Sequence, residues 1–337
     1  MKKYFVMPLL CAAFILSAGE SYNFYMVSDT HFGTADSFAE RVSDAKRYRA
    51  DKAMPVYREV FADMAKKSDQ NTKFMIHVGD VIEGNAKDDL AQQKEFEKAI
   101  AFFKEYFKFP VYYVRGNHET SGGKAGYING LLPEISRTAG KKLKASTYAF
   151  RQGEDLFIFV DCYSRGWAEF IEKTLDEQKS KPRYVFVTMH EDRLVPFRDA
   201  VTQRIFNKLA GYKSVVLHGH THCTLKVSQN VGGKVVTGFV VGTCLGGKRP
   251  HLEKPVTDFN KQLVRIYRQA GFNKNPAKKA FFDKESVPYI TGVQDYSKNG
   301  RSQGYAKIFV SDEGVYVMAQ SSDLKQAPVR IDLIPAK

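Results

Sequence analysis

Cysteine is scarce in this chain, which contains four in 337 residues. Cys11 falls within an apolar N-terminal stretch, which leaves Cys162, Cys223 and Cys244 in the remainder. Three is an odd number, so at least one thiol stays unpaired, and a protein built on a disulfide framework is excluded. Cys223 lies beside a histidine cluster; it is either a soft metal ligand or, the interpretation we prefer, a small buried residue.

Long apolar runs are also missing, apart from one at the N-terminus. Residues 4–16 are apolar with a single proline, follow Lys2 and Lys3, and precede three small residues at 17–19. This pattern is typical of a signal peptide over residues 1–19, and the run is too short for a comfortable transmembrane helix. We therefore expect export to a periplasm or the medium, with no transmembrane segment in the mature chain. A lipid anchor through Cys11 is the alternative, although two leucines stand before it where a small residue is expected.

Acidic residues do not balance the basic ones. The chain has 51 Lys and Arg against 37 Asp and Glu, a formal net charge of +14. Such a charge attracts anionic substrates, nucleic acids or membrane surfaces, or belongs to a basic surface without a dedicated partner. No aromatic and basic platform for stacking bases is evident, so nucleic acid is possible as a partner but is not favoured over a small anionic substrate.

Apolar runs alternate with helical patterns along the first two thirds of the chain, which predicts α/β layers. Hairpins in the last third predict a second, more antiparallel sheet. The predicted strands cover residues 24–27, 74–78, 111–114, 148–151, 156–160, 184–189, 215–217, 224–228, 235–243, 305–310 and 315–319, and the predicted helices lie near 55–64, 87–107, 167–175 and 198–209.

Three segments have no clear period. Residues 34–53 predict a surface loop with some helix, and 121–130, rich in glycine and lysine, predict a loop that overhangs a pocket. Residues 247–303 are basic and aromatic and predict an irregular insertion or cap. The length allows one large α/β domain or two small ones, and we expect residues 20–337 to form a single domain.

A metal-type ligand follows five of the apolar runs directly. In open α/β sheets, ligands gather beyond the carboxyl ends of the strands, so we expect one sheet edge to collect these side chains. In an extended chain, His220 and His222 would project to the same side. The five sets are Asp29 with His31, Asp80, Asn117 with His118, His190, and His220 with His222.

Two aspartates, an asparagine and four histidines form a mixed nitrogen and oxygen donor set. Such a set suits Mn, Fe, Zn or Co better than Ca or Mg. Seven ligands are too many for one tetrahedral ion but fit two ions that share a carboxylate. A two-metal centre holds a bridging hydroxide that attacks a phosphoryl group in line. His118, beside the asparagine, has the right chemistry to protonate the leaving oxygen.

The ordered series closely resembles the calcineurin-like metallophosphoesterase family. Its blocks are Asp29-x-His31, Gly79-Asp80, Gly116-Asn117-His118-Glu119, His190 and Gly219-His220-x-His222. The resemblance implies a four-layer α/β/β/α sandwich, two packed sheets flanked by helices. It also implies that Asp29, His31 and His222 hold one of two divalent or mixed-valence metal ions, that Asn117, His190 and His220 hold the other, that Asp80 bridges them, and that His118 contacts the phosphate as general acid.

The resemblance leaves the reaction open within one class. We expect an exported phosphomonoesterase; the alternative is a phosphodiesterase or nucleotidase, nucleases included, with the same two-metal site. A non-catalytic binding scaffold is disfavoured, because the donor set is complete. Purple acid phosphatases have a tyrosine ligand where this chain has Glu83, so an iron–tyrosinate centre is not expected. The natural substrate, the metals and the oligomeric state are not predicted.

Other polar residues near the blocks have plainer interpretations. His77 and His218 are expected in the core or as outer partners that orient ligands. Arg115 either contacts phosphate or forms a structural salt bridge, and Asp161 is expected in an outer position. Three residues that open the 247–303 segment fit a solvated loop better than an anion site: Lys248, Arg249 and His251.

Overall fold

The computed structural model describes residues 19–33, 50–84, 86–121, 123–191, 193–243, 252–256, 258, 272, 275–297 and 302–336. Most of the predicted signal peptide with Cys11 lies outside these ranges, as do Cys244, the Lys248–His251 group and residues 34–49. Among the described residues, no helix has the length and hydrophobicity that a membrane span requires.

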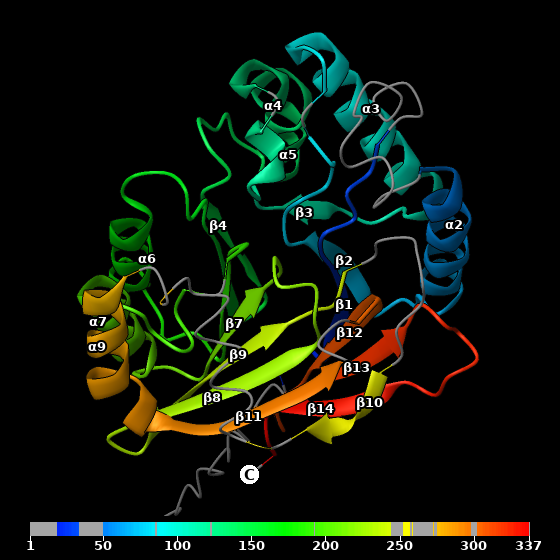
Figure 1. The fold of residues 1–337 in the computed structure, drawn as a ribbon. Coiled ribbons are helices and arrows are strands. Elements are labelled where there is room, and N and C mark those ends of the chain that lie inside the picture. The colour runs from blue at the N-terminus through cyan, green and yellow to red at the C-terminus, as the bar shows by residue number, and fades with distance from the viewer. Residues whose placement is uncertain are drawn as a thin grey trace, which may run out of the picture.

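Two β-sheets form the centre of the fold (Figure 1). The first has the strand order β14-β13-β12-β1-β2-β3, and the second has the order β10-β11-β8-β9-β7-β6-β5-β4. The strands are β1 (Tyr22–Val27), β2 (Thr72–His77), β3 (Val111–Tyr113), β4 (Tyr148–Gln152), β5 (Asp155–Phe159), β6 (Val185–Thr188), β7 (Ser214–His218), β8 (Leu225–Val231), β9 (Lys234–Val240), β10 (Leu252–Val256), β11 (Ile290–Ser297), β12 (Gly304–Val310), β13 (Val315–Ser321) and β14 (Val329–Ile334).

Helices cover the outer face of each sheet (Figure 1). Side chains of α2 and α3 join the core that lies against the first sheet, and side chains of α6, α7 and α9 join the core of the second. The predicted arrangement of two packed sheets flanked by helices is therefore confirmed. The helices are α2 (Ala50–Lys66), α3 (Asp89–Tyr106), α4 (Lys124–Gly130), α5 (Leu132–Thr138), α6 (Trp167–Asp176), α7 (Ala200–Leu209) and α9 (Pro276–Glu285).

Aromatic rings fill the space between the two sheets. The Phe24 ring of β1 lies 5.4 Å from that of Phe157 and 5.7 Å from that of Phe186, both edge to face. Phe74 of β2 meets Phe157 in the same way at 5.2 Å. Edge-to-face pairs of this kind add to the stabilisation that burial alone gives. They fix how the strands of one sheet lie over those of the other.

Each sheet combines strands from distant parts of the chain, contrary to our prediction for the last third. β12, β13 and β14 do not form a separate sheet, because β12 pairs antiparallel with β1 and extends the first sheet. β8 and β11 extend the second sheet in the same way. Apolar alternation reports which residues are buried but not which strand is the neighbour.

Two segments predicted to be irregular contain regular structure. Residues 124–130 form α4 rather than a loop, because Gly126 and Gly130 have no side chains and approach Gln92 and Phe96 of α3 closely. Within 247–303, the described residues contain β10, α9 and β11, and β11 hydrogen bonds to β8. Leu90, an apolar residue of the predicted helix 87–107, is 59% exposed at the start of α3.

A buried ion pair joins the two sheets at the amino-terminal ends of β1 and β5. The carboxylate of Asp155 (β5) is fully buried and accepts two hydrogen bonds from the Arg183 guanidinium, at 3.0 and 2.6 Å. It also accepts the hydroxyl of Tyr22 (β1) at 2.8 Å. Arg183 reaches Asp312, in the turn after β12, at 2.6 Å. Burial of a carboxylate is tolerated only with such partners.

We expect Arg183→Met to lower the free energy of unfolding by about 3–5 kcal/mol, because it leaves the Asp155 carboxylate buried without its cation. Urea denaturation followed by circular dichroism measures the loss. The matched control is Arg330→Met, whose exposed pair with Asp332 should contribute less than about 1 kcal/mol. Equal stability of the two variants would contradict this role for Arg183.

Candidate metal centre

The predicted ligands lie just beyond the ends of strands from both sheets, not along one sheet edge. Asp29 and His31 follow β1 and Asp80 follows β2 in the first sheet; His190 follows β6 and His220 follows β7 in the second. The carboxyl ends of these strands face one another across the interface between the sheets. Side chains from five connections therefore meet in one place.

The backbone turns sharply at these positions. Within the described ranges, the residues other than glycine with positive φ are all predicted ligands: Asp29 (51°), His31 (45°), Asp80 (53°), His220 (67°) and His222 (55°). A left-handed conformation costs about 1–3 kcal/mol for such residues and is typical of functional sites. The chain after His218 is therefore not extended, and the condition under which we expected His220 and His222 to project to the same side is not met.

Three of the predicted ligands form a first group. The Nε2 atom of His222 lies 3.2 Å from Oδ1 of Asp29 and 3.4 Å from Nε2 of His31, and His31 Nε2 lies 3.9 Å from Asp29 Oδ1. The other oxygen of Asp29 accepts the main-chain N–H of His220 at 2.9 Å and the hydroxyl of Ser28. These hydrogen bonds leave Oδ1 directed at the two imidazoles.

Asp80, His190 and His220 form a second group. Oδ2 of Asp80 lies 3.1 Å from Nε2 of His190, which lies 3.2 Å from Nδ1 of His220. The same Asp80 oxygen is 3.8 Å from Nε2 of His31, in the first group. Asp80 thus stands between the two groups, and the structure splits His220 and His222 between them.

The donor atoms fit a pair of transition metal ions. Ligand atoms bound at about 2.0–2.2 Å to one ion lie roughly 3–3.5 Å from one another. The imidazole–imidazole and imidazole–carboxylate distances of 3.1–3.4 Å match this. The donor atoms within each of the two groups lie within 4.8 Å of one another, as do those of a third set formed by His31, Glu83 and His118. Oδ1 of Asp29 is buried and has no hydrogen bond, which suits an atom that faces a cation.

Asn117, the remaining predicted ligand, lies on the side of the second group. Tyr163 donates its hydroxyl to Oδ1 of Asn117 at 3.5 Å, and the Tyr163 ring lies 6.5 Å from that of His190. Arg115 and Arg193 lie over the Tyr163 ring at 5.1 and 5.5 Å. In the sequence, Tyr163 is marked only by its place three residues beyond the predicted strand 156–160.

His118 lies at the accessible side of the cluster. Its Nε2 is 4.0 Å from Oδ2 of Asp80, and its main-chain N–H donates to Oδ1 of Asp80 at 2.9 Å. Its Nδ1 faces the carbonyl oxygen of Glu83 at 2.5 Å, and its side chain is 25% exposed. The predicted proton donor can therefore reach both the cluster and a bound substrate.

Two buried glutamates were not predicted to have a role. Oε2 of Glu83 lies 2.8 Å from Nδ1 of His31, on the side of the ring opposite to Nε2, which faces the first group. Glu119 accepts the main-chain N–H groups of Asp80, Val81 and Gly116 at 3.0, 2.6 and 2.5 Å. It ties together the turns after β2 and β3, a role that only contact in three dimensions reveals.

The electrostatics of the cluster favour ionised aspartates. Burial alone raises the pKa of the Asp80 carboxyl, but His190, His31 and His118 outweigh it, and the pKa lies well below its usual range. Burial and the charge of Asp80 raise the pKa of Glu119 to about 7. A cation at the cluster would supply the positive charge that the aspartates require.

Four outer residues have structural partners. His77 is buried, which lowers its pKa to about 3, and it hydrogen bonds to Thr30 at 3.0 Å; Nδ1 of His218 lies 3.2 Å from the carbonyl of Glu191. Arg115 forms a salt bridge with Asp161 at 3.0 Å. Cys162 and Cys223 are buried, and Cys223 belongs to none of the three ligand groups found among the described residues.

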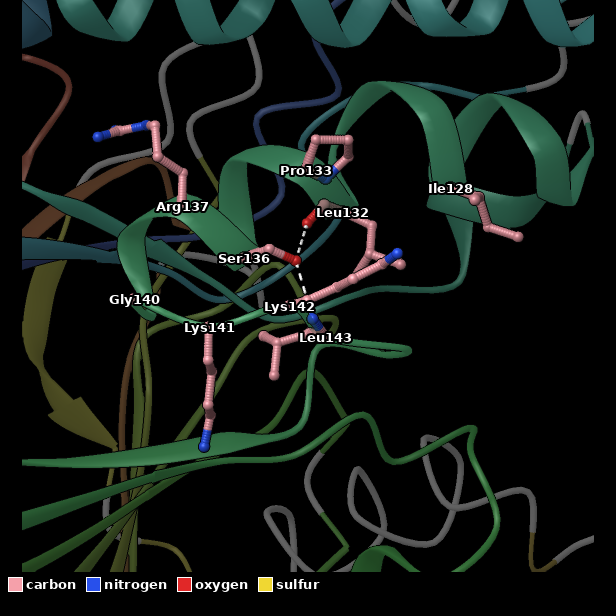
Figure 2. A pocket seen from close by; sticks show the side chains of 9 residues that line it. All are labelled: Ile128, Leu132, Pro133, Ser136, Arg137, Gly140, Lys141, Lys142 and Leu143. Atoms are coloured by element: carbon pink, nitrogen blue, oxygen red, sulfur yellow. Dashed lines mark hydrogen bonds between the residues drawn. The ribbon is translucent and has the colours of Figure 1, made fainter.

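The hollow of about 610 Å³ on α4 and α5 is a separate feature (Figure 2). None of the predicted site residues lines it. Figure 2 shows Arg137 and Lys141 pointing in different directions, and Arg137 pairs with Glu134 at 2.6 Å. Its cations therefore do not converge on one anion.

We expect Gly116→Ala to weaken metal binding at least tenfold, because a Cβ would stand 2.1 Å from Oδ1 of Asp80 and would displace that carboxylate. Metal content after gel filtration, measured by atomic spectroscopy, reports the effect. Gly292→Ala is the control, since its Cβ would have no heavy atom within 4 Å. Equal metal content in both variants would show that the position of Asp80 does not govern binding.

Comparison with known proteins agrees with this geometry. The family model described as calcineurin-like phosphoesterase matches residues 22–224, more than half of the chain. A search of curated proteins finds no match. Among solved structures, a dimetal phosphatase from Danio rerio is similar, with a TM-score of 0.55 and 10% identity over 93% of this chain and 99% of its own.

Two further structures are more distant. The GAP50 anchor of the inner membrane complex of Plasmodium has a TM-score of 0.49 and 12% identity over 94% of this chain and 90% of its own. PhoD has a TM-score of 0.48 and 10% identity over 93% of this chain and 68% of its own. At these identities, structural likeness concerns the fold alone. On the family match over residues 22–224, the chain belongs to the calcineurin-like phosphoesterases, whose members bind a dinuclear metal centre.

Proposed function

We propose that the chain is an exported, metal-dependent phosphomonoesterase. The observation that supports it is the pair of ligand groups joined at Asp80, with the partly exposed His118 beside them. Asp29, His31 and His222 would hold one ion, and Asn117, His190 and His220 the other, with Asp80 between. The ions, when bound, would supply the nucleophile from water and neutralise charge on the phosphoryl group.

The residues of the chain have distinct parts in this reaction. His118 holds a proton close to the substrate: burial lowers its pKa, but Asp80 and the Glu83 carbonyl outweigh this and raise it above the usual value. The imidazolium form donates from Nε2 to the leaving oxygen, since Nδ1 is held by Glu83. Asp29, Asp80 and His190 are buried, so water reaches the cluster on the side of the exposed His220 and of His118 and His222, whose side chains are 25% and 21% exposed.

Removal of metal should abolish hydrolysis of p-nitrophenyl phosphate, and Mn, Zn, Fe or Co should restore it. We expect Asp80→Asn to lose more than about 100-fold in kcat/KM together with bound metal, because the shared ligand is lost. Asp332→Asn, on the exposed face of β14, is the control. Full activity of chelated protein, or of Asp80→Asn, would contradict the proposal, and a preference for bis(p-nitrophenyl) phosphate would move the function to the phosphodiesterases.

We expect His118→Ala to keep its metal but to lose about 10²–10⁴-fold in kcat for alkyl phosphates, whose leaving oxygens need a proton. The loss should be smaller for p-nitrophenyl phosphate, because its leaving group departs without protonation. A plot of log kcat against leaving-group pKa should therefore be steeper for the variant than for the wild type. Equal losses for both substrates would assign His118 to binding rather than to proton transfer.

Export is the part of the proposal that rests on the predicted signal peptide at 1–19. The basic start, the apolar run and the small residues at 17–19 support it. The mass of the protein recovered from the exporting cell tests it, since cleavage near residue 19 would shorten the chain, and recovery of the uncleaved chain from the cytoplasm would contradict it.

A further inference from the structure

A second cavity adjoins the candidate metal centre on the side of His190. It has a volume of about 350 Å³ and lies between the start of α6, the loop after β6, the start of α7 and α9. Pockets for small ligands have volumes of about 300–1,000 Å³. The cavity is therefore large enough for part of a substrate.

Residues that line the cavity also adjoin residues of the metal centre. Glu191 lines the cavity and follows His190 directly in the chain, and its carbonyl lies 3.2 Å from Nδ1 of His218. Arg193, also in the lining, lies over one face of the Tyr163 ring, whose hydroxyl donates to Asn117. The Glu191 carboxylate is also close enough to His220, the exposed member of the second ligand group, to interact with it electrostatically, so a group bound in the cavity would lie beside His220.

Among the described residues that line the cavity, cations outnumber carboxylates by one. Its cations are Arg193, Arg198 and Lys278, against the carboxylates of Glu191 and Asp199. Both carboxylates already have partners. Glu191 accepts Arg193 at 2.6 and 2.8 Å, and Asp199 caps α7 by accepting the main-chain N–H of Thr202 at 2.9 Å.

Lys278 carries the charge that remains. It lies on the first turn of α9, is exposed, and forms no ion pair with any of the residues that the structure describes. Trp167, the only tryptophan in the chain, also lines the cavity, at the start of α6, and offers a flat apolar surface. The lining therefore combines an aromatic ring with a lysine that forms no ion pair with the described residues.

We propose that this cavity binds a second anionic group of the substrate. The preferred substrates are then phosphomonoesters that carry a phosphate or a carboxylate at their far end, with a flat segment against Trp167. This inference rests on the proposed function for the reaction itself, while binding in the cavity can be measured without turnover.

The kinetic test compares 4-carboxyphenyl phosphate with 4-carbamoylphenyl phosphate, which has the same shape but a neutral far end. Benzene-1,4-diyl bisphosphate distinguishes a phosphate from a carboxylate as the second group. We expect the metal-loaded wild type to have a lower KM for the substrates whose far end is charged than for the one whose far end is neutral. Lys278→Glu should lower that preference about tenfold, because an attractive charge becomes a repulsive one. Lys284→Glu, on an exposed site of the same helix, should keep the preference.

The binding test uses the fluorescence of Trp167, which reports the cavity directly. 4-Carboxyphenylphosphonate, which cannot be hydrolysed, should quench it at a lower concentration than phenylphosphonate does. The difference should disappear in Lys278→Glu and persist in Lys284→Glu. Equal binding of the two phosphonates by the wild type would overturn the inference, as would an undiminished preference in Lys278→Glu.

The two tests separate this inference from the proposed function. If the wild type hydrolyses phenyl phosphate but shows no preference in either test, the phosphomonoesterase proposal stands and the second anion site is wrong. If no phosphate ester is hydrolysed, the proposed function fails, and the fluorescence titrations still decide whether the cavity binds an anion.

Discussion

The carboxylate of Asp80 is 2% exposed, and an ionised carboxylate is stable at such depth only among positive or hydrogen-bonding partners. Here the partners are His31 from the end of β1, His118 from the end of β3 and His190 from the end of β6, at 3.1–4.0 Å. They belong to two different sheets. The centre therefore exists only while both sheets keep their positions relative to each other to within a fraction of an ångström.

Backbone hydrogen bonds carry the alignment past the ends of the strands. The register of β1 and β2 pairs Val27 with His77, and the ladder continues as Asp29 donates to Gly79 and His31 donates to Asp80, both at 3.0 Å. These bonds hold residues whose left-handed φ values are costly by themselves. The buried aromatic layer between the sheets offsets that cost and fixes the second half of the cluster against the first.

The strands and the donor residues were predictable because both leave a local trace in the sequence. The predicted strand 74–78, followed at once by Gly79-Asp80, shows a buried strand and a ligand side by side. The pairing of β12 with β1 leaves no such trace, since it joins residues almost 300 positions apart. The helix α4 was missed because its glycines favour a loop locally, and only their contact with α3 makes the helix stable.

The parts of the site that escaped prediction share one property. Glu119 and Tyr163 act on other residues, through main-chain N–H groups and through Asn117, so their side chains carry no donor pattern of their own. Glu83 was interpreted only as the absence of a tyrosine, whereas it holds His31 in a defined orientation. Short motifs predict which residues are ligands, but the orientation of those ligands depends on residues that only the fold brings into contact with them.

The same distinction separates the chemistry of the centre from its selectivity. The cluster is open on the side of His118, His220 and His222, so the body of a substrate must lie over the connections that surround this opening. Those connections include the loop after β6 and also α9, which belongs to the segment 247–303 that has no clear period in the sequence. A centre built from strand ends can thus keep one reaction while the loops and helices around it decide which phosphate ester is bound.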